Sequence, residues 1–393
     1  MRTPTIFTTI LVMLAPVALP AGAQLAMAPP ADLRNNAALD YQRAIYFMER
    51  RTDRQKQIVN SYDSPQIDHD AAAQFLNSAS FALNLIHRAA KQMWCDWGLR
   101  LDQDGPRTLL PYLNGIRRMA EVMLLESRVK LQDGDDSAAV DDWFCALAIG
   151  RHAGCNGIPV ALLVDYGVEA MVATNAALDL NRLDEPALTS LSAELEKLPP
   201  GGTLAQAAQV EQEITQRWIL RKLQRPGGQN PNDSLKKLLQ AVAGPSLANE
   251  RVDAALAACG GTADGLAQRL LALEPLYARI ASTIALPYDQ FVKQWPDLQH
   301  DIDADPVARV IIMSRYPQLV RSHAMAQAQL AMFEAAIDVV RKGPDALQSH
   351  PDPFGNGPFT YRQTPRGFEL TSALIDEASA SRPVTLRIGR DSR

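Results

Sequence analysis

The densest group of residues suited to chemistry is Trp94, Cys95, Asp96 and Trp97. Two indoles beside a carboxylate could form an aromatic platform that holds a sugar or a peptide. The alternative is structural: the indoles bury a helix end, and Asp96 accepts backbone hydrogen bonds. Because tryptophan is usually largely buried, residue type favours the structural interpretation. Trp94, Asp96 and Trp97 are nevertheless our candidate binding residues.

The four cysteines are a second source of chemistry. Their spacings contain no C-x-x-C and fit no zinc or redox motif. If the chain is exported, disulfides are permitted, and four cysteines allow three complete pairings. We favour a bond from Cys95 to Cys145 or Cys155. The alternative is that all four are unbonded, buried side chains; the disulfide candidates are Cys95, Cys145, Cys155 and Cys259.

No other motif indicates a reaction. The chain has no H-E-x-x-H, no G-x-S-x-G, no phosphate-binding loop and no dinucleotide fingerprint. Its six histidines are dispersed, so we predict no metal site and no cofactor. The acidic pairs at 135–136 and 141–142 are interpreted as helix caps and solvated helix faces. A hydrolase would need two carboxylates facing across a cleft, which a sequence cannot show.

The first 23 residues have the pattern of a secretory signal peptide. Arg2 precedes an apolar run at 6–19, and Ala21-Gly22-Ala23 provides a cleavage site before Gln24. The alternative, a membrane anchor, would need to cross ~30 Å of hydrocarbon, and this run is short and interrupted by proline. We therefore expect an exported protein, periplasmic or extracellular, without a transmembrane segment in the mature chain.

Size and charge narrow the class further. A chain of 393 residues with 47% hydrophobic content can bury two cores. Its formal net charge of −5 and its small, scattered basic clusters do not favour a nucleic-acid surface. We expect no nucleic-acid partner.

Apolar spacing predicts a mainly α fold built of packed antiparallel helix hairpins. The clearest hairpin covers 108–153 and turns at Gly134, with Pro111 in the first helical turn. The apolar or small residues of its first helix fall on one stripe: Leu109, Leu113, Ile116, Ala120, Met123 and Ser127. Further helices are predicted at 36–60, 68–94, 159–180, 203–224 and 305–341, the last with a break at Pro317.

Clusters of proline and glycine, which interrupt helices, mark the predicted boundaries between parts of the chain. The cluster at 199–202 separates an N-terminal helical subdomain (24–200) from a second one (201–345). The tail, 346–393, is predicted to carry a small β-hairpin with strands at 359–362 and 367–371. A third strand is predicted at 384–388, and the hairpin must pack on the preceding helix to be stable.

Two resemblances follow from these residues. The hairpin with Gly134, Ala139, Trp143 and Ala146 resembles the second half of a tetratricopeptide repeat. No second copy is in register, so a tandem array is not expected.

The segment DPFGNGPFTY at 352–361, followed by GFEL at 367–370, resembles the C-terminal hairpin of the major pseudopilins of type II secretion. Together with the segment CDWGL at 95–99, it is similar to uncharacterised secreted helical proteins of planctomycete-type bacteria. That group implies no activity. Fibre assembly and calcium binding are not implied, because the pseudopilin N-terminal helix and the acidic loop are missing.

These observations predict an exported, non-enzymatic interaction or scaffold protein whose partner is a protein or another envelope component. The alternative is an envelope hydrolase that acts on cell-wall polymer through carboxylates the sequence does not reveal. Paired carboxylates with perturbed pKa values in a deep cleft would favour the enzyme. A concave helical groove without them would favour partner binding.

Overall fold

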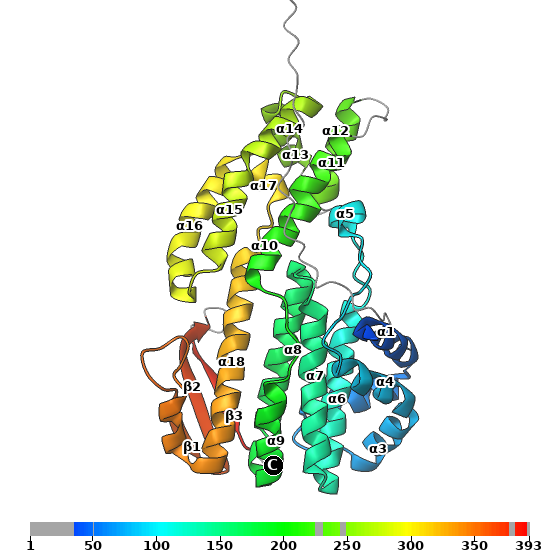
Figure 1. Cartoon of the computed structure of the whole chain (residues 1–393), viewed down its shortest axis with the longest axis vertical. Coiled ribbons are helices and arrows are strands. Elements are labelled where there is room, and N and C mark those ends of the chain that lie inside the picture. The colour runs from blue at the N-terminus through cyan, green and yellow to red at the C-terminus, as the bar shows by residue number, and fades with distance from the viewer. Residues whose placement is uncertain (1–34, 50, 225–230, 244–248, 377–381, 391–393) are drawn as a thin grey trace, which may run out of the picture.

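The computed structural model describes residues 35–49, 51–224, 231–243, 249–376 and 382–390. The predicted signal peptide lies outside the described residues. The fold is mainly α, with a small antiparallel sheet near the C-terminus, as predicted (Figure 1). Figure 1 shows two groups of elements, one above the other, with the long helix α18 reaching from one to the other.

The first group contains the N-terminal helices. In chain order these are α1 (Ala37–Met48), α2 (Asp53–Val59), α3 (His69–Ser78), α4 (Ser80–Ala90), α5 (Leu101–Asp104), α6 (Leu113–Asp133), α7 (Asp136–Gly154), α8 (Pro159–Ala177) and α9 (Glu185–Leu195). The second group contains α10 (Leu204–Gln212), α11 (Trp218–Leu223), α12 (Pro231–Ala243), α13 (Asn249–Ala258), α14 (Ala263–Ala272), α15 (Glu274–Ile284), α16 (Tyr288–Ala304) and α17 (Ala308–Ile311). The chain then returns through α18 (Tyr316–Lys342) to β1 (Thr360–Thr364), β2 (Gly367–Asp376) and β3 (Arg382–Ile388).

The α6–α7 hairpin forms as predicted. Gly134 adopts φ +80°, the left-handed conformation that ends α6, and Asp135 caps α7 by accepting the N–H of Ala138. The predicted start was wrong. Pro111 precedes the helix because the chain first turns at 110–113, and Leu109, expected on the buried stripe, is 82% exposed.

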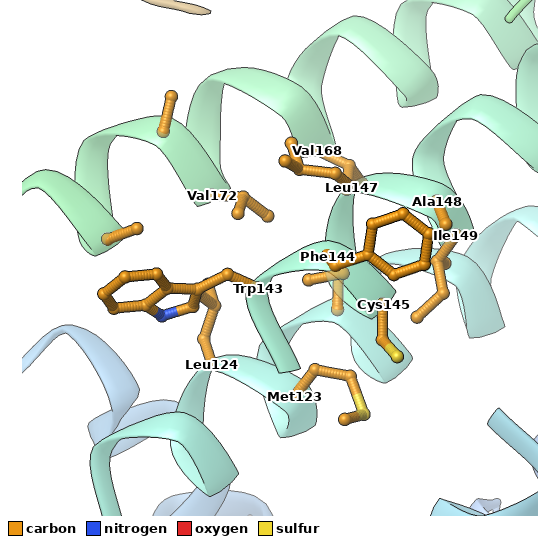
Figure 2. Close-up of a cluster of buried hydrophobic side chains, with 14 of the residues drawn as sticks. Met123, Leu124, Trp143, Phe144, Cys145, Leu147, Ala148, Ile149, Val168 and Val172 are labelled. Atoms are coloured by element: carbon orange, nitrogen blue, oxygen red, sulfur yellow. The ribbon is translucent and has the colours of Figure 1, made fainter. Parts of the chain in front are cut away.

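The interior of this hairpin is the centre of the larger core. Trp143 is fully buried, and its indole N–H donates to Ser127 Oγ at 3.0 Å. Figure 2 shows Trp143 lying between Leu124 of α6 and Val172 of α8. Because helices cover α7 on several sides, most of its side chains are buried, including Asp142, which the sequence analysis placed on a solvated face.

Two of the long helices predicted near the N-terminus are each broken in two. The helix expected at 36–60 divides into α1 and α2, and Thr52 begins α2 with a capping box to Gln55. The helix expected at 68–94 divides at Ala79 into α3 and α4, and it ends at Ala90. Trp94 therefore lies outside the helix, in the extended segment that leads to α5.

Other predicted boundaries are confirmed. Thr203 caps α10 with a capping box to Gln206, and α18 begins at Tyr316 after a break, with Pro317 in its first turn. The helix expected at 203–224 contains an unpredicted π-helical segment, Glu213–Arg217.

Two hydrophobic cores account for most of the buried side chains. The first joins the N-terminal helices other than α5 to the C-terminal half of α18 and the sheet. The second joins α10–α17 and the start of α8 to the N-terminal half of α18. Thus Phe333 of α18 belongs to the first core and Tyr316 to the second. The residues 199–202 lie between α9 and α10.

The sheet has the order β1-β2-β3, and both pairs are antiparallel. Leu370 of β2 lies opposite Tyr361 on one side and Leu386 on the other. The predicted third strand is confirmed, and β2 continues to Asp376, beyond its predicted end. Both β2 and β3 pack on α18, as a small sheet requires.

One stretch among the described residues, Pro159–Arg182, is long and apolar enough to cross a membrane. More than half of its most apolar window, 56%, is buried inside the protein, as in the core helix of a soluble protein. The absence of a transmembrane segment stays a prediction.

Candidate functional site

The predicted binding residues lie in the segment that connects α4 to α5. Trp94 is half-buried, and its carbonyl accepts the N–H of Ala37 at 3.1 Å. Asp96 is exposed, and its backbone exchanges two hydrogen bonds with the Asn36 side chain, at 2.8 and 2.9 Å. Its carboxylate accepts the N–H of Gly98 at 2.9 Å. Asp96 therefore holds the start of this segment against the N-terminus of α1.

Trp97 lies deeper and is only 5% exposed. Its ring stacks on Tyr112, with centroids 3.9 Å apart and planes 6° from parallel. The centroid of the Tyr41 ring lies 6.1 Å from that of Trp97. Its indole N–H donates to the carbonyl of His152 at 2.9 Å. Trp97 thus fills the interior rather than presenting a face to solvent.

His152 completes this buried polar group. Nε2 lies 2.9 Å from the carbonyl of Gln92, which can only accept, so Nε2 carries the proton. Nδ1 then accepts the hydroxyl hydrogen of Tyr41 at 3.0 Å. Burial lowers the pKa of His152 to about 4. The imidazole is therefore neutral at pH 7 and serves as a structural hydrogen-bonding group.

The four cysteines are unbonded thiols in the structure. Cys155 lies beside Cys95, with its Sγ 3.2 Å from the Cys95 carbonyl oxygen. Cys145 instead lies 3.2 Å from His87 Nδ1. Cys259 is in the second core. The structure thus brings one of the two favoured disulfide pairs, Cys95 and Cys155, into one neighbourhood.

A groove of about 510 Å³ opens where the segment after Trp97 meets α11. The indole N–H of Trp218 donates to the carbonyl of Gln103 at 3.0 Å and ties the two walls together. Gly105 has φ +58°, and a Cβ there would lie 2.5 Å from the Trp218 ring. The lining residues come from these two elements: Gly98, Leu99, Arg100, Gln103, Asp104, Arg107, Thr108, Leu109, Trp218 and Lys222.

The groove combines apolar surface with positive charge. Leu109 is the most exposed large apolar side chain of the described residues, and Lys222 Nζ lies 5.1 Å from the Trp218 ring centroid. Arg100 and Arg107 add two more cations, against one carboxylate, Asp104, among the lining residues that the structure describes. This local excess of positive charge contrasts with the net negative charge of the whole chain.

A second cluster of polar side chains lies under the surface between α4, α6 and α7. His87 Nδ1 is 3.1 Å from Asp141 Oδ2, and His87 Nε2 is 3.3 Å from Asp142 Oδ1. Glu126 Oε2 lies 3.6 Å from Nε2. Lys130 bridges the two buried carboxylates, 2.7 Å from Asp142 and 3.2 Å from Glu126.

The interpretation of 141–142 as a solvated face was wrong for Asp142, whose side chain is fully buried. Burial raises the pKa of Asp142 to about 6, and the charge of Glu126 acts in the same direction. One signal in the sequence could have revealed the pair. Glu126 and Asp142 both lie eight residues from Gly134, and residues equally far from the turn face each other in an antiparallel hairpin.

A third group of titratable side chains lies on α7 and α8. Asp165 is buried, its Oδ1 has no hydrogen-bond partner, and burial together with the charge of Glu169 raises its pKa. Arg151 Nε donates to Glu169 Oε1 at 2.8 Å. Gly150 and Gly154 leave the space that the Asp165 carboxylate fills. None of these side chains lines the groove.

The structure thus contains an open groove beside Trp218 and two buried polar clusters, one around His87 and one around Asp165. Their possible functions must be judged from their geometry. The resemblances to a tetratricopeptide repeat, to the pseudopilin hairpin and to secreted planctomycete-type proteins stay predictions from sequence. Comparison with known proteins adds no family to them, since no family model, no curated protein and no solved structure matches this chain.

Proposed function

We propose that this chain is an exported, non-enzymatic interaction protein that binds an acidic, partly apolar segment of an envelope protein in the groove beside Trp218. The observation that carries the proposal is the composition of the groove: Leu109 provides exposed apolar surface beside the largely buried ring of Trp218, and Arg100, Arg107 and Lys222 add positive charge. Export rests on the leader pattern of the first 23 residues.

The charge favours an acidic partner. The described residues that line the groove include three cations and one carboxylate, and the Arg100–Asp104 contact is long, at 3.9 Å. Such a local potential attracts anionic groups and speeds their association, even on a protein that is acidic as a whole. Apolar residues in the same segment would cover Leu109, which is otherwise exposed at an energetic cost.

The walls of the groove are already fixed before any partner binds. Trp218 is held by Gln103 and by close contact with Gly105, so its indole has little freedom to lose. Preorganisation of this kind lowers the entropic cost of association.

The same lining residues favour binding over hydrolysis of a cell-wall polymer. A two-carboxylate mechanism needs two acids facing each other across the substrate, and among the described residues Asp104 is the only acid that lines the groove. The hydroxyl of Thr108 is already used, because it donates to the carbonyl of Gly105 at 2.7 Å. The buried acids with raised pKa, Asp142 and Asp165, lie elsewhere.

The test uses a fluorescein-labelled peptide of alternating glutamate and leucine, titrated with the purified protein and followed by anisotropy. Arg107→Glu and Lys222→Glu should each weaken binding about tenfold, since loss of a favourable charge contact of about 1.4 kcal/mol corresponds to that factor. Arg54→Glu makes the same charge change at an exposed site on α2 and should leave binding unchanged.

A second experiment looks for the natural partner. The protein with a photo-crosslinking side chain at position 109 is incubated with envelope extract, and crosslinked peptides are identified by mass spectrometry. Capture of an acidic segment that Lys222→Glu abolishes would support the proposal. If the labelled peptide binds both charge-reversal variants as well as it binds the unmodified protein, the groove is not the binding site.

A further inference from the structure

The cluster around His87 has the geometry of a metal-binding site. His87 comes from α4, Glu126 from α6 and Asp142 from α7, and one ligand atom of each lies within 4.8 Å of the others. Ligands ~2.1 Å from a tetrahedral ion are about 3.4 Å apart. The distances from His87 Nε2 to Asp142 Oδ1 and to Glu126 Oε2 are 3.3 and 3.6 Å. An ion could therefore fit with only small side-chain shifts.

Two buried oxygen atoms in this cluster have no partner at hydrogen-bond distance. Glu126 Oε2 and Asp142 Oδ2 are both buried and without a hydrogen-bond partner. The Asp142 side chain is fully buried, and that of Glu126 is 14% exposed. A buried carboxylate oxygen without a hydrogen-bond partner costs free energy. Two such oxygens on neighbouring residues therefore indicate a ligand-binding site. A metal ion would give both oxygens the close contact that they lack.

The second ring nitrogen of His87, Nδ1, has the kind of partner found in known metal sites. Histidine ligands usually donate their second ring N–H to a carboxylate, which fixes the tautomer and orients the ring. His87 Nδ1 lies 3.1 Å from Asp141 Oδ2. Lys91 in turn lies 3.3 Å from Asp141 Oδ1 and holds that carboxylate in place. Nε2 is then free to face the two buried acids.

We propose that His87 Nε2, Glu126 and Asp142 bind a divalent transition-metal ion such as Zn²⁺, with Asp141 as the orienting carboxylate. One imidazole and two carboxylates suit Zn²⁺, Mn²⁺ and Fe²⁺. This proposal departs from the sequence-based prediction that the chain binds no metal. It is independent of the groove, because none of its residues lines it.

Lys130 acts as an internal competitor for this ion. Its ammonium group lies 2.7 Å from Asp142 and 3.2 Å from Glu126, so it partly neutralises the two acids when no metal is bound. Its side chain is 24% exposed, which allows it to move towards solvent when the metal enters. Removal of this charge should strengthen metal binding, whereas a purely structural charge network would only lose stability.

Cys145 provides a way to test the choice of ring nitrogen. Its Sγ lies 3.2 Å from His87 Nδ1. His87, Asp141 and Cys145 therefore form an alternative triad at the Nδ1 edge of the ring. That triad would place a thiolate on the ion, and the triad with Glu126 and Asp142 would not. We choose the latter because the unpaired buried oxygens are on that side.

The experiment is isothermal titration of chelator-treated protein with ZnCl₂. One equivalent should bind. His87→Gln and Asp142→Asn should each weaken binding at least about 100-fold, since even partners of a ligand are worth ten- to a hundredfold. Lys130→Met should bind Zn²⁺ about tenfold or more tightly, because a competing charge is gone. His69→Gln is the matched control, since His69 also contacts two carboxylates, Asp133 and Asp70, but near the surface.

Circular dichroism of each variant establishes that it is folded, and Glu126→Gln replaces Asp142→Asn if the latter unfolds. Co²⁺ then reports on the ligands: the proposed set gives no sulfur-to-metal charge-transfer band, and Cys145→Ser binds as the unmodified protein does. The proposal is overturned if Zn²⁺ does not bind, or if folded His87→Gln binds it equally well. A charge-transfer band that Cys145→Ser abolishes would move the ion to the other triad and contradict the proposed ligands.

Discussion

Glu211 makes the stability of the second core depend on pH in an unusual direction. The side chain is on α10 and is only 3% exposed. Its carboxyl oxygens accept the N–H of Met313 at 3.1 Å and the hydroxyl of Tyr316 at 3.3 Å. Burial nevertheless dominates and raises the pKa of Glu211 from its ordinary 4.5 to about 8.

The sign of the effect follows from proton binding. Between pH 4.5 and pH 8 the unfolded chain has lost the Glu211 proton and the folded chain has kept it, so the free energy of unfolding falls as pH rises. Each pH unit in this window costs about 1.4 kcal/mol, and the full window roughly 5 kcal/mol. Below pH 4.5 both states are protonated, and the full stability is present.

The perturbation is Glu211→Gln, which keeps the size of the side chain and removes its charge. Urea unfolding is measured at pH 5, 6, 7 and 8 for both proteins. The difference between them cancels the contributions of other titrating groups. We expect Glu211→Gln to gain stability relative to the unmodified protein by about 1.4 kcal/mol for each pH unit towards pH 8.

The matched control is Glu196→Gln, which removes an exposed carboxyl group at the end of α9. It should follow the unmodified protein at every pH. A difference between Glu211→Gln and the unmodified protein that stays constant from pH 5 to pH 8 would refute the reasoning. It would show that Glu211 is ionised in the fold and held by its hydrogen bonds.

Three further predictions concern the buried residues near Trp97. Trp97→Ala should lower the free energy of unfolding by ~3 kcal/mol or more, because it removes a buried ring stacked on Tyr112, and thermal melting measures this; unchanged melting with altered binding of the labelled peptide would restore the aromatic-platform interpretation. Because burial lowers the pKa of His152 to about 4, the unfolded chain gains the proton first as pH falls from 6.5 to 4, which should cost up to roughly 3 kcal/mol. Urea midpoints should therefore fall less in His152→Gln over this range, and equal losses in both proteins would contradict the assignment. Mild oxidation with diamide should join Cys95 to Cys155, whose thiols are in hydrogen-bonding contact; peptide mapping that finds four free thiols, or a bond to Cys145, would contradict this arrangement.

Local chemistry made much of the fold predictable. Gly134, Asp135 and Thr203 act as the sequence predicts, because a left-handed residue and side-chain caps need only their immediate neighbours. The third strand was also recognisable from its alternating pattern, and the structure confirms it at 382–388. Helix interruptions were missed where tertiary contacts decide them, as at Ala79, where no proline or glycine marks the break.

The candidate sites were less predictable because they depend on contacts between distant residues. Asp142 looks like a surface residue until α4 and α6 are placed against α7. His87 is far from both acids in sequence, so its approach to them depends on how α4 crosses the hairpin. The groove depends on Trp218 meeting the carbonyl of Gln103, a contact between residues more than a hundred positions apart.

The position of α18 has a consequence for any attempt to divide this protein. This one helix of 27 residues packs into both hydrophobic cores: Tyr316, at its start, belongs to the second core, and Phe333, farther along, belongs to the first. A fragment that stops at residue 200 would leave the first interior open along that side, and its exposed apolar surface would promote aggregation. Unfolding of one core should therefore remove the packing of α18 from the other core. Calorimetry of the intact chain should then record one cooperative transition.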